Sequence, residues 1–201
     1  MGRAAEDVSE GHRYRATDVT GTRPARGVVT VGTDHHQFNR LMDWLDQWNR
    51  ANPAAVEWTV QHGSSRPLTG IDGYSLKPHT ELLEDLRQAD LVVTQGGPGG
   101  IMDSRACGVL PIVVPRLARL NEVVDDHQVA FARQLAGKGL IELAQSESEL
   151  HAVLDRAVRA PDQFALTAGS SDVAQTVSTF GAVVDALVSS TPACRWRLRR
   201  R

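Results

Sequence analysis

Short apolar segments alternate with amphipathic ones along this chain, and that alternation limits the folds it can adopt. Runs of β-branched and aliphatic residues predict strands at 27–31, 56–61, 90–94, 111–114 and 140–141, with a further short strand at 73–76. Apolar residues at helical spacing predict helices between these strands. Strands that alternate with helices form βαβ units, which need a parallel sheet covered by helices on both faces. We therefore expect an α/β fold with a Rossmann-like, doubly wound parallel sheet.

The chain has 201 residues, which is enough for one domain and short for two. We expect a loosely ordered arm at 1–26, the folded domain at 27–160, a helical extension at 161–190 and a basic tail at 191–201. The net charge of −2 argues against nucleic acid as a partner. The polar N-terminus has no secretory signal, no segment has the roughly 20 apolar residues of a membrane span, and the two cysteines lie far apart. These features predict a cytoplasmic protein.

Polar loops follow four of the expected strands, and in a parallel sheet such loops gather at the carboxyl edge, where ligands bind. The loops are 32–36, 62–66, 95–100 and 116–126, and the third has four glycines. In the last loop, Arg116 and Arg119 are the basic residues. His62 and Arg66 could border the same crevice, but exposed loop positions explain them as well. Trp44 and Trp48 are interpreted as packing residues rather than as a platform for a sugar.

The 95–100 loop, Gln-Gly-Gly-Pro-Gly-Gly, joins a buried strand to the next helix. Glycine lets a ligand approach the backbone closely, and the N-terminus of the helix offers unpaired N–H groups and the positive end of its dipole. Asp103, one turn into that helix, is placed to accept hydrogen bonds from a ribose while the amides bind phosphate. The same turn also suits tight packing of a helix on a strand, so both interpretations stay open. The missing Lys-Ser or Lys-Thr disfavours a P-loop NTPase, and the position after a late strand disfavours a dehydrogenase.

Two further clusters lie in the crevice loops. Asp125 or Asp126 is expected to cap the helix that begins there, whereas His127 and Gln128 could bind sugar hydroxyls. In the first loop, His35 or His36 could act as a base or contact phosphate, and a pair of solvated histidines is an equal alternative. Neither histidine is expected to have a further metal ligand at zinc-binding spacing.

Taken in order, several motifs of the chain resemble the C-terminal domain of glycosyltransferase family 28, most closely its free-standing Alg13-like and PssE-type exopolysaccharide subunits. The resemblance covers residues 27–158. The motifs that carry it are VTVGT at 29–33, ADLVVTQGGPGG at 89–100, GVLPIVVP at 108–115 and VDDHQ at 124–128.

The resemblance implies a single half of a GT-B enzyme, the domain that binds the UDP-sugar donor. Gly99 and Gly100 match the turn that receives the diphosphate, Asp103 replaces the family's usual glutamate on the ribose, and Gln128 matches a polar group near the donor sugar. The remaining expected contacts of the nucleotide sugar are Gly32, Thr33, Gln95, Gly96, Gly97, Asp126 and His127. No metal or other cofactor is expected, because the helix dipole and amides can neutralise the leaving diphosphate.

The function that the resemblance implies is transfer of a sugar from a UDP-sugar to a lipid-linked acceptor in exopolysaccharide synthesis. The acceptor-binding half is expected to be a separate Alg14-like, membrane-anchored subunit, which would hold this chain at the inner face of the plasma membrane. The base would be His35, His36 or a group of that partner. In PssE-type relatives glucuronate is one candidate sugar, and Arg116 or Arg119 could bind its carboxylate. The basic tail could contact lipid or partner, or be merely solvated.

Two other functions are considered, and the first of them stays open. The chain could be a non-catalytic nucleotide-sugar-binding or regulatory subunit, because Gln95, Gly100 and Asp103 depart from the family's usual histidine, hydroxyl residue and glutamate. A GT-B epimerase is disfavoured, because such enzymes hold both domains in one chain.

Overall fold

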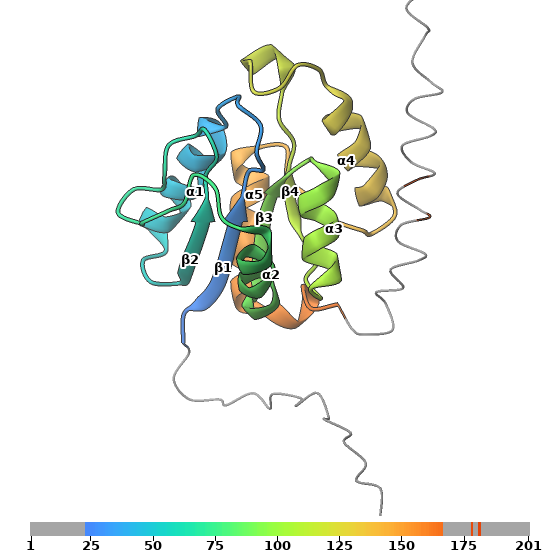
Figure 1. Ribbon diagram of the computed structural model, residues 1–201. Helices are drawn as coiled ribbons and strands as arrows, with labels where there is room; N and C mark the ends of the chain where they lie inside the picture. Colours follow the sequence, from blue (N-terminus) through green and yellow to red (C-terminus); the bar gives the residue numbers. More distant parts are fainter. Residues whose placement is uncertain (1–22, 167–177, 179–180, 182–201) are drawn as a thin grey trace, which may run out of the picture.

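Five parallel strands form one sheet in the order β2-β1-β3-β4-β5 in the computed structural model, which describes residues 23–166 together with Ser178 and Gly181 (Figure 1). The strands are β1 (Ala25–Thr30), β2 (Val56–Gln61), β3 (Leu91–Gln95), β4 (Ile112–Val114) and β5 (Glu142–Leu143). The helices are α1 (Asn39–Ala51), α2 (His79–Gln88), α3 (Pro98–Ala106), α4 (His127–Gly137) and α5 (Glu147–Arg159), with short 3-10 turns η1 (Ala118–Leu120) and η2 (Pro161–Gln163). The expected Rossmann-like α/β fold is confirmed.

Helices cover both faces of the sheet, because successive strand residues point to opposite sides. Val29, Val31 and Val93 point towards α1 and α5, and form the largest core cluster with the apolar faces of those helices. Val28 and Val92 point the other way and pack against α2, while α3 and α4 pack on the same side over β4. Figure 1 shows α2 and α3 in front of the sheet and α5 behind it.

The ends of some elements differ from the expectations. Strand β1 begins at Ala25, inside the expected arm, because the N–H of Arg26 donates to the Asp90 carboxylate at 2.8 Å and Ala25 pairs with Ala55. The expected strand at 73–76 is reduced to a single bridge at Tyr74, which exchanges backbone hydrogen bonds with β2. The Ser146 cap of α5 is confirmed, since its hydroxyl accepts the N–H of Glu149.

The terminal segments lie mostly outside the described residues. After η2, the N–H of Leu166 donates to the carbonyl of Gly108, which ties this segment to the start of β4. Ser178 and Gly181 are helical, whereas the rest of the expected extension from 167 and the expected basic tail fall outside the description, as do residues 1–22. Among the residues described, no helix has the length and apolar character needed to cross a bilayer.

Close packing between the first two strands makes a testable prediction. A Cβ on Gly27 would lie 2.5 Å from the Trp58 ring and from Val56. Gly27→Ala should therefore destabilise the fold by roughly 1–3 kcal/mol through overpacking, measured by urea unfolding. The matched control is Gly137→Ala at the end of α4, where nothing lies within 4 Å and the change should be neutral or stabilising by up to about 1 kcal/mol. Equal effects of the two substitutions would contradict this packing.

Candidate functional site

The loops after β1 and β3 meet at the carboxyl edge of the sheet. These strands are neighbours and run level, with Thr30 opposite Thr94. The chain leaves β1 towards β2 on one side and leaves β3 towards β4 on the other. This is the topological switch point of the sheet, the place where doubly wound folds form a ligand crevice.

Glycine is required where the two loops touch. Gly32 has a φ of +71°, which favours glycine, and a Cβ there would lie 2.2 Å from the side-chain nitrogen of Gln95. A Cβ on Gly97 would come within 3.1 Å of the same nitrogen. The Gln95 side chain therefore fills the space between the two loops. Beside them, Thr33 is exposed.

The N-terminus of α3 is open. Its cap residue Gly97 supplies no side-chain hydrogen bond, and Pro98 occupies the first turn. Around Gly99 nothing lies within 4 Å of a built Cβ, so a ligand can reach this backbone. Gly100 is constrained differently, because a Cβ there would lie 2.6 Å from the Thr94 hydroxyl oxygen. The turn thus combines the two expected roles of its glycines, an uncovered approach at one position and close packing at the other.

Gln128 lies against the glycine turn from the side of α4. A Cβ on Gly96 would be 3.1 Å from the Cβ of Gln128 and 3.4 Å from its side-chain oxygen. That oxygen is buried and has no hydrogen-bond partner among the described residues. A buried acceptor without a donor is uncommon in folded proteins, and a ligand hydroxyl could satisfy it.

Asp103 lies on α3, at its contact with α2. One carboxylate oxygen is 2.9 Å from Nε2 of His79, the first residue of α2. The Asp103 side chain is 30% exposed, and no other hydrogen bond of the described residues involves it. Sequence reasoning did not single out His79. The sequence does contain a signal for His79, because Pro78 opens a helix whose N-terminus lies at the same edge of the sheet as that of α3.

Arg116 connects three crevice loops through its buried guanidinium. The side chain is fully buried. Its Nε donates to the Gln95 oxygen at 2.5 Å, and its terminal nitrogens donate to the carbonyls of His36, Glu122 and Val31 at 2.7, 2.9 and 2.9 Å.

Burial lowers the pKa of Arg116, and the charges of Asp34 and Glu122 oppose that shift. The expectation that Arg116 binds a uronate carboxylate is therefore wrong, because the side chain is enclosed and four of its five N–H groups already donate hydrogen bonds within the protein. Arg119 is exposed.

The two histidines of the first loop have different surroundings. Nδ1 of His36 is 2.7 Å from the Asp34 carboxylate, whose oxygen also accepts the His36 backbone N–H at 2.8 Å. His35 is 3.6 Å from the same oxygen and its side chain is 86% exposed, against 15% for His36. Burial alone would raise the pKa of Asp34, but the two hydrogen bonds from His36 and the charge of Arg116 lower it overall. Asp34 is thus held ionised and orients the His36 ring.

Asp34 also corrects the expectation about metal ligands. The ligand atoms of Asp34, His35 and His36 all lie within 4.8 Å of one another. A carboxylate does therefore stand near enough to both histidines for the three to share an ion. Because two hydrogen bonds from His36 already engage Asp34, we interpret the pair as an oriented histidine.

The aspartates before α4 brace the last crevice loop. Asp125 accepts the backbone N–H of His127, the first residue of α4, at 3.0 Å and lies 2.7 Å from its Nδ1, whereas Asp126 occupies the N-cap position without a side-chain capping bond. Asp126 accepts the N–H of Ala118 in η1 at 2.9 Å. The exposed ring of His127 faces solvent beside Gln128. Of the four residues 125–128, only Gln128 packs on the glycine turn.

His62, Arg66 and Trp48 contribute to structure. His62 closes its own turn on the carbonyl of Ser65 at 2.7 Å, and Arg66 pairs with Asp43 and Asp46 on α1. Trp48 is buried, as the packing interpretation expects. Trp44 is half-buried at the wall of a pocket.

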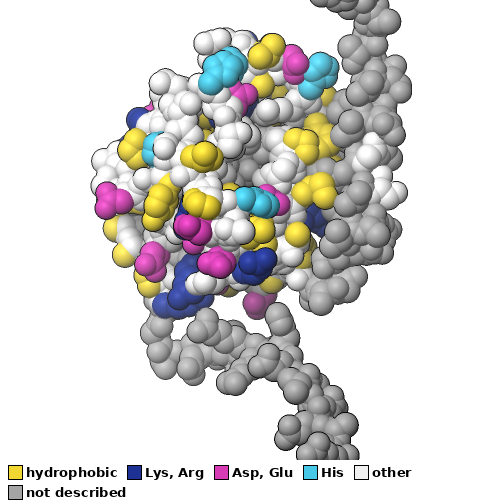
Figure 2. Space-filling model, viewed as in Figure 1, with side chains coloured by type: hydrophobic (Ala, Val, Ile, Leu, Met, Phe, Trp, Pro, Cys, Tyr) yellow, Lys and Arg dark blue, Asp and Glu magenta, His cyan; other side chains and the backbone are white. Residues whose placement is uncertain are grey.

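No residue of the glycine turn lines that pocket. It has a volume of about 790 Å³ and is lined by the loop after β1, the exposed side of α1, the η1 region and the start of α5. Histidine, acidic and apolar side chains mix along the upper edge of the molecule in Figure 2, where the strands of Figure 1 end.

The Arg116 network makes a prediction for stability. Arg116→Met removes four hydrogen bonds and leaves three carbonyls and the Gln95 amide without their donor, so it should destabilise the protein by roughly 3 kcal/mol. Arg119→Met, on the exposed part of the same loop, should change stability by less than about 0.5 kcal/mol. Both are measured by chemical denaturation. Equal stability of the two variants would show that the buried guanidinium does not secure the loops.

Comparison with known proteins shows the family of the chain. The chain matches the model of the glycosyltransferase family 28 C-terminal domain over residues 28–179, well over half of its length. No curated protein matches the chain.

Solved glycosyltransferase structures are among the proteins that are similar to this chain. CalG4, the calicheamicin glycosyltransferase, has a TM-score of 0.54 and 12% identity, over 84% of this chain and 43% of that one. The glycotransferase of kitacinnamycin has a TM-score of 0.49 and 21% identity, over 89% of this chain and 43% of that one. MurG from Acinetobacter baumannii has a TM-score of 0.49 and 16% identity, over 85% of this chain and 51% of that one. The chain spans about half of these proteins or less. It belongs, by its family match and its parallel α/β fold, to the glycosyltransferase family 28 C-terminal domain, the nucleotide-sugar-binding half of GT-B enzymes.

Proposed function

We propose that this chain is the donor-binding subunit of a two-component glycosyltransferase that moves a sugar from a UDP-sugar to a lipid-linked acceptor in exopolysaccharide synthesis. The observation that carries the proposal is the uncovered N-terminus of α3 at the switch point of the sheet. Asp103 follows this turn on α3, and the buried, unsatisfied oxygen of Gln128 lies near Gly96. A nucleoside diphosphate sugar fits such an arrangement, since ribose, phosphates and sugar each meet a suitable group.

The reaction in this proposal is a direct displacement at the anomeric carbon. The acceptor hydroxyl oxygen forms a bond to that carbon while the bond from the carbon to the diphosphate oxygen breaks, and UDP leaves with the electron pair. The amides of Gly99 and Gly100 and the dipole of α3 stabilise the leaving diphosphate, so no metal is needed for this step. The proton of the acceptor passes to a general base.

His36 is the better base of the two histidines. The Asp34 carboxylate holds its Nδ1, which leaves Nε2 to accept a proton, as a carboxylate does for histidine in hydrolytic triads. His35 has only the longer contact with Asp34 and stands mostly in solvent.

A second, Alg14-like subunit anchored in the membrane would bind the acceptor. This subunit would place the chain at the inner face of the plasma membrane. The exposed Leu120 and Val124 extend from the crevice loop before α4, where an acceptor-binding half would face the donor site.

A non-catalytic nucleotide-sugar-binding subunit is the alternative. The observation that favours it is the contact between Asp103 and His79, because the carboxylate expected to hold the ribose is already engaged. A subunit of this kind would bind UDP and give no transfer when the partner is added.

Binding of UDP is the first test. At a UDP concentration 100-fold above Kd, the protein should gain about 2.7 kcal/mol of stability, a rise in Tm of roughly 5–10 °C. Asp103→Ala should largely remove the rise, whereas Asp162→Ala in η2, which makes no side-chain hydrogen bond among the described residues, should preserve it. Differential scanning calorimetry measures both. If neither UDP nor any UDP-sugar raises Tm, with or without the partner, the chain is not a donor-binding subunit.

Turnover with the partner tests the base. His36→Ala should lower kcat by about 10²–10⁴-fold with little change in the KM for the UDP-sugar, because proton transfer is lost while donor contacts remain. His35→Ala should stay within a few-fold of the unsubstituted enzyme. A radiolabelled sugar-transfer assay with the reconstituted pair measures these rates. Full activity of His36→Ala would assign the base to His35 or to the partner.

A further inference from the structure

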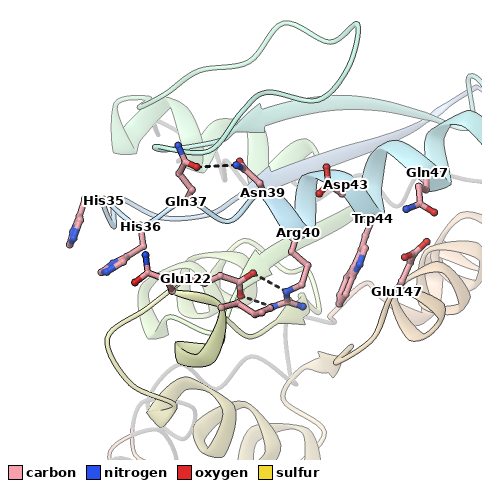
Figure 3. A pocket seen from close by; sticks show the side chains of 12 residues that line it. His35, His36, Gln37, Asn39, Arg40, Asp43, Trp44, Gln47, Glu122 and Glu147 are labelled. Carbon is pink, nitrogen blue, oxygen red and sulfur yellow. Dashed lines mark hydrogen bonds and ion pairs between the residues drawn. The ribbon is translucent and has the colours of Figure 1, made fainter.

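We propose that the pocket between α1, η1 and α5 is a second carbohydrate subsite, selective for a neutral or amino sugar over an anionic one. It is separate from the expected nucleotide contacts, because no residue of the glycine turn lines it. Figure 3 shows His35 and His36 at one end of the pocket, Trp44, Gln47 and Glu147 at the other, and Arg40 with Glu122 between them. A volume of about 790 Å³ can hold one or two sugar rings.

In the middle of the pocket, the side chains of Arg40 and Glu122 are hydrogen-bonded to each other and to the backbone. Two nitrogens of Arg40 donate to the Glu122 carboxylate at 2.9 and 2.8 Å, and one of them also donates to the carbonyl of Pro115 at 2.9 Å. Glu122 is buried and accepts the backbone N–H of Leu117 at 3.0 Å. The two charges of this pair neutralise each other, so the pair supports the pocket without adding net charge to it.

Groups that are free to recognise a sugar surround this pair. Gln47, Asn121 and Glu147 line the pocket, and their side chains make no hydrogen bond within the described part of the chain. Trp44 is half-buried, and the Arg40 guanidinium lies 4.6 Å from the centre of its ring. An aromatic wall with planar amide and carboxylate groups suits a sugar, whose C–H groups pack on rings and whose hydroxyls need donors and acceptors.

The charges of the pocket determine which sugar it accepts. Arg40 neutralises Glu122, and Arg66 pairs with Asp43 at 2.6 Å. Glu147 remains as a carboxylate without a cationic partner among the described residues. Glu147 would therefore repel an anionic ligand. The hydroxyl groups of a neutral sugar could donate hydrogen bonds to Glu147, and the ammonium group of an amino sugar could form an ion pair with it. The pocket is thus unsuited to a phosphate or a uronate.

The position of the pocket assigns it to the acceptor. His36 lines its end and belongs to the loop that touches the glycine turn through Gln95. A sugar bound here could present a hydroxyl to His36 from the side opposite to the nucleotide. This assignment to the acceptor rests on the proposed transfer reaction, but the sugar selectivity of the pocket does not.

The test is a titration of the full chain with two matched probes, methyl β-D-glucopyranoside and methyl β-D-glucuronide, followed by NMR of the tryptophan indole N–H signals. The neutral probe should shift the Trp44 signal saturably, and the glucuronide should bind about tenfold more weakly, equivalent to about 1.4 kcal/mol. Glu147→Gln should retain the neutral probe and remove most of the discrimination. Gln47→Ala should weaken both probes, and Asp162→Asn should change neither.

Two results would overturn the subsite. The first is that the neutral probe causes no saturable shift of the Trp44 signal. Equal Tm values of the variants and the unsubstituted chain show that all of them are folded in this experiment. The other is equal binding of both probes to the unsubstituted chain. The titration is made with and without UDP. If the chain binds the neutral probe but does not bind UDP, the subsite is supported and the donor role is refuted. If the chain binds UDP but not the neutral probe, only the subsite is refuted.

Discussion

The crevice of this protein depends on a guanidinium that is buried without a carboxylate in direct contact. Burying a charge is unfavourable unless hydrogen bonds replace its water, and Arg116 meets this condition with three carbonyls and one amide. Those four acceptors belong to three separate loops, so one side chain sets the spacing of the strand ends around the switch point. The ring of Phe38, 4.9 Å from the guanidinium, completes its enclosure. The loops of the site are therefore fixed by the core beneath them.

This arrangement separates residues that shape the crevice from those that can meet a ligand. Gln95 lies among the expected nucleotide contacts in the sequence, yet its oxygen accepts from Arg116 and its nitrogen separates Gly32 from Gly97. The exposed backbone of Gly99, the Asp103 carboxylate oxygen that His79 does not contact and the oxygen of Gln128 remain for the ligand. Because their supports are in place without it, the site is preorganised, and binding does not have to order the loops.

The sequence supports the fold and the location of the crevice better than it supports the individual contacts. Strand and helix periodicity predicts the order of elements, the glycine turn and the Ser146 cap, since each depends on residues near one another in the chain. The interior position of Arg116 could not be predicted, because a basic residue after a strand in a polar loop is normally solvent-exposed. The His79–Asp103 contact requires α2 and α3 to be neighbours, and the free carboxylate of Glu147 matters only where α5 meets α1. Such relations arise from tertiary packing.

The most direct test of this arrangement is a crystal structure of the chain with a UDP-sugar. We expect the diphosphate at the N-terminus of α3 against Gly99, the ribose on Asp103 and the sugar near Gln128, with the Arg116 contacts unchanged. Density for the nucleotide at any other place, or displacement of Arg116 from its four acceptors on binding, would contradict it.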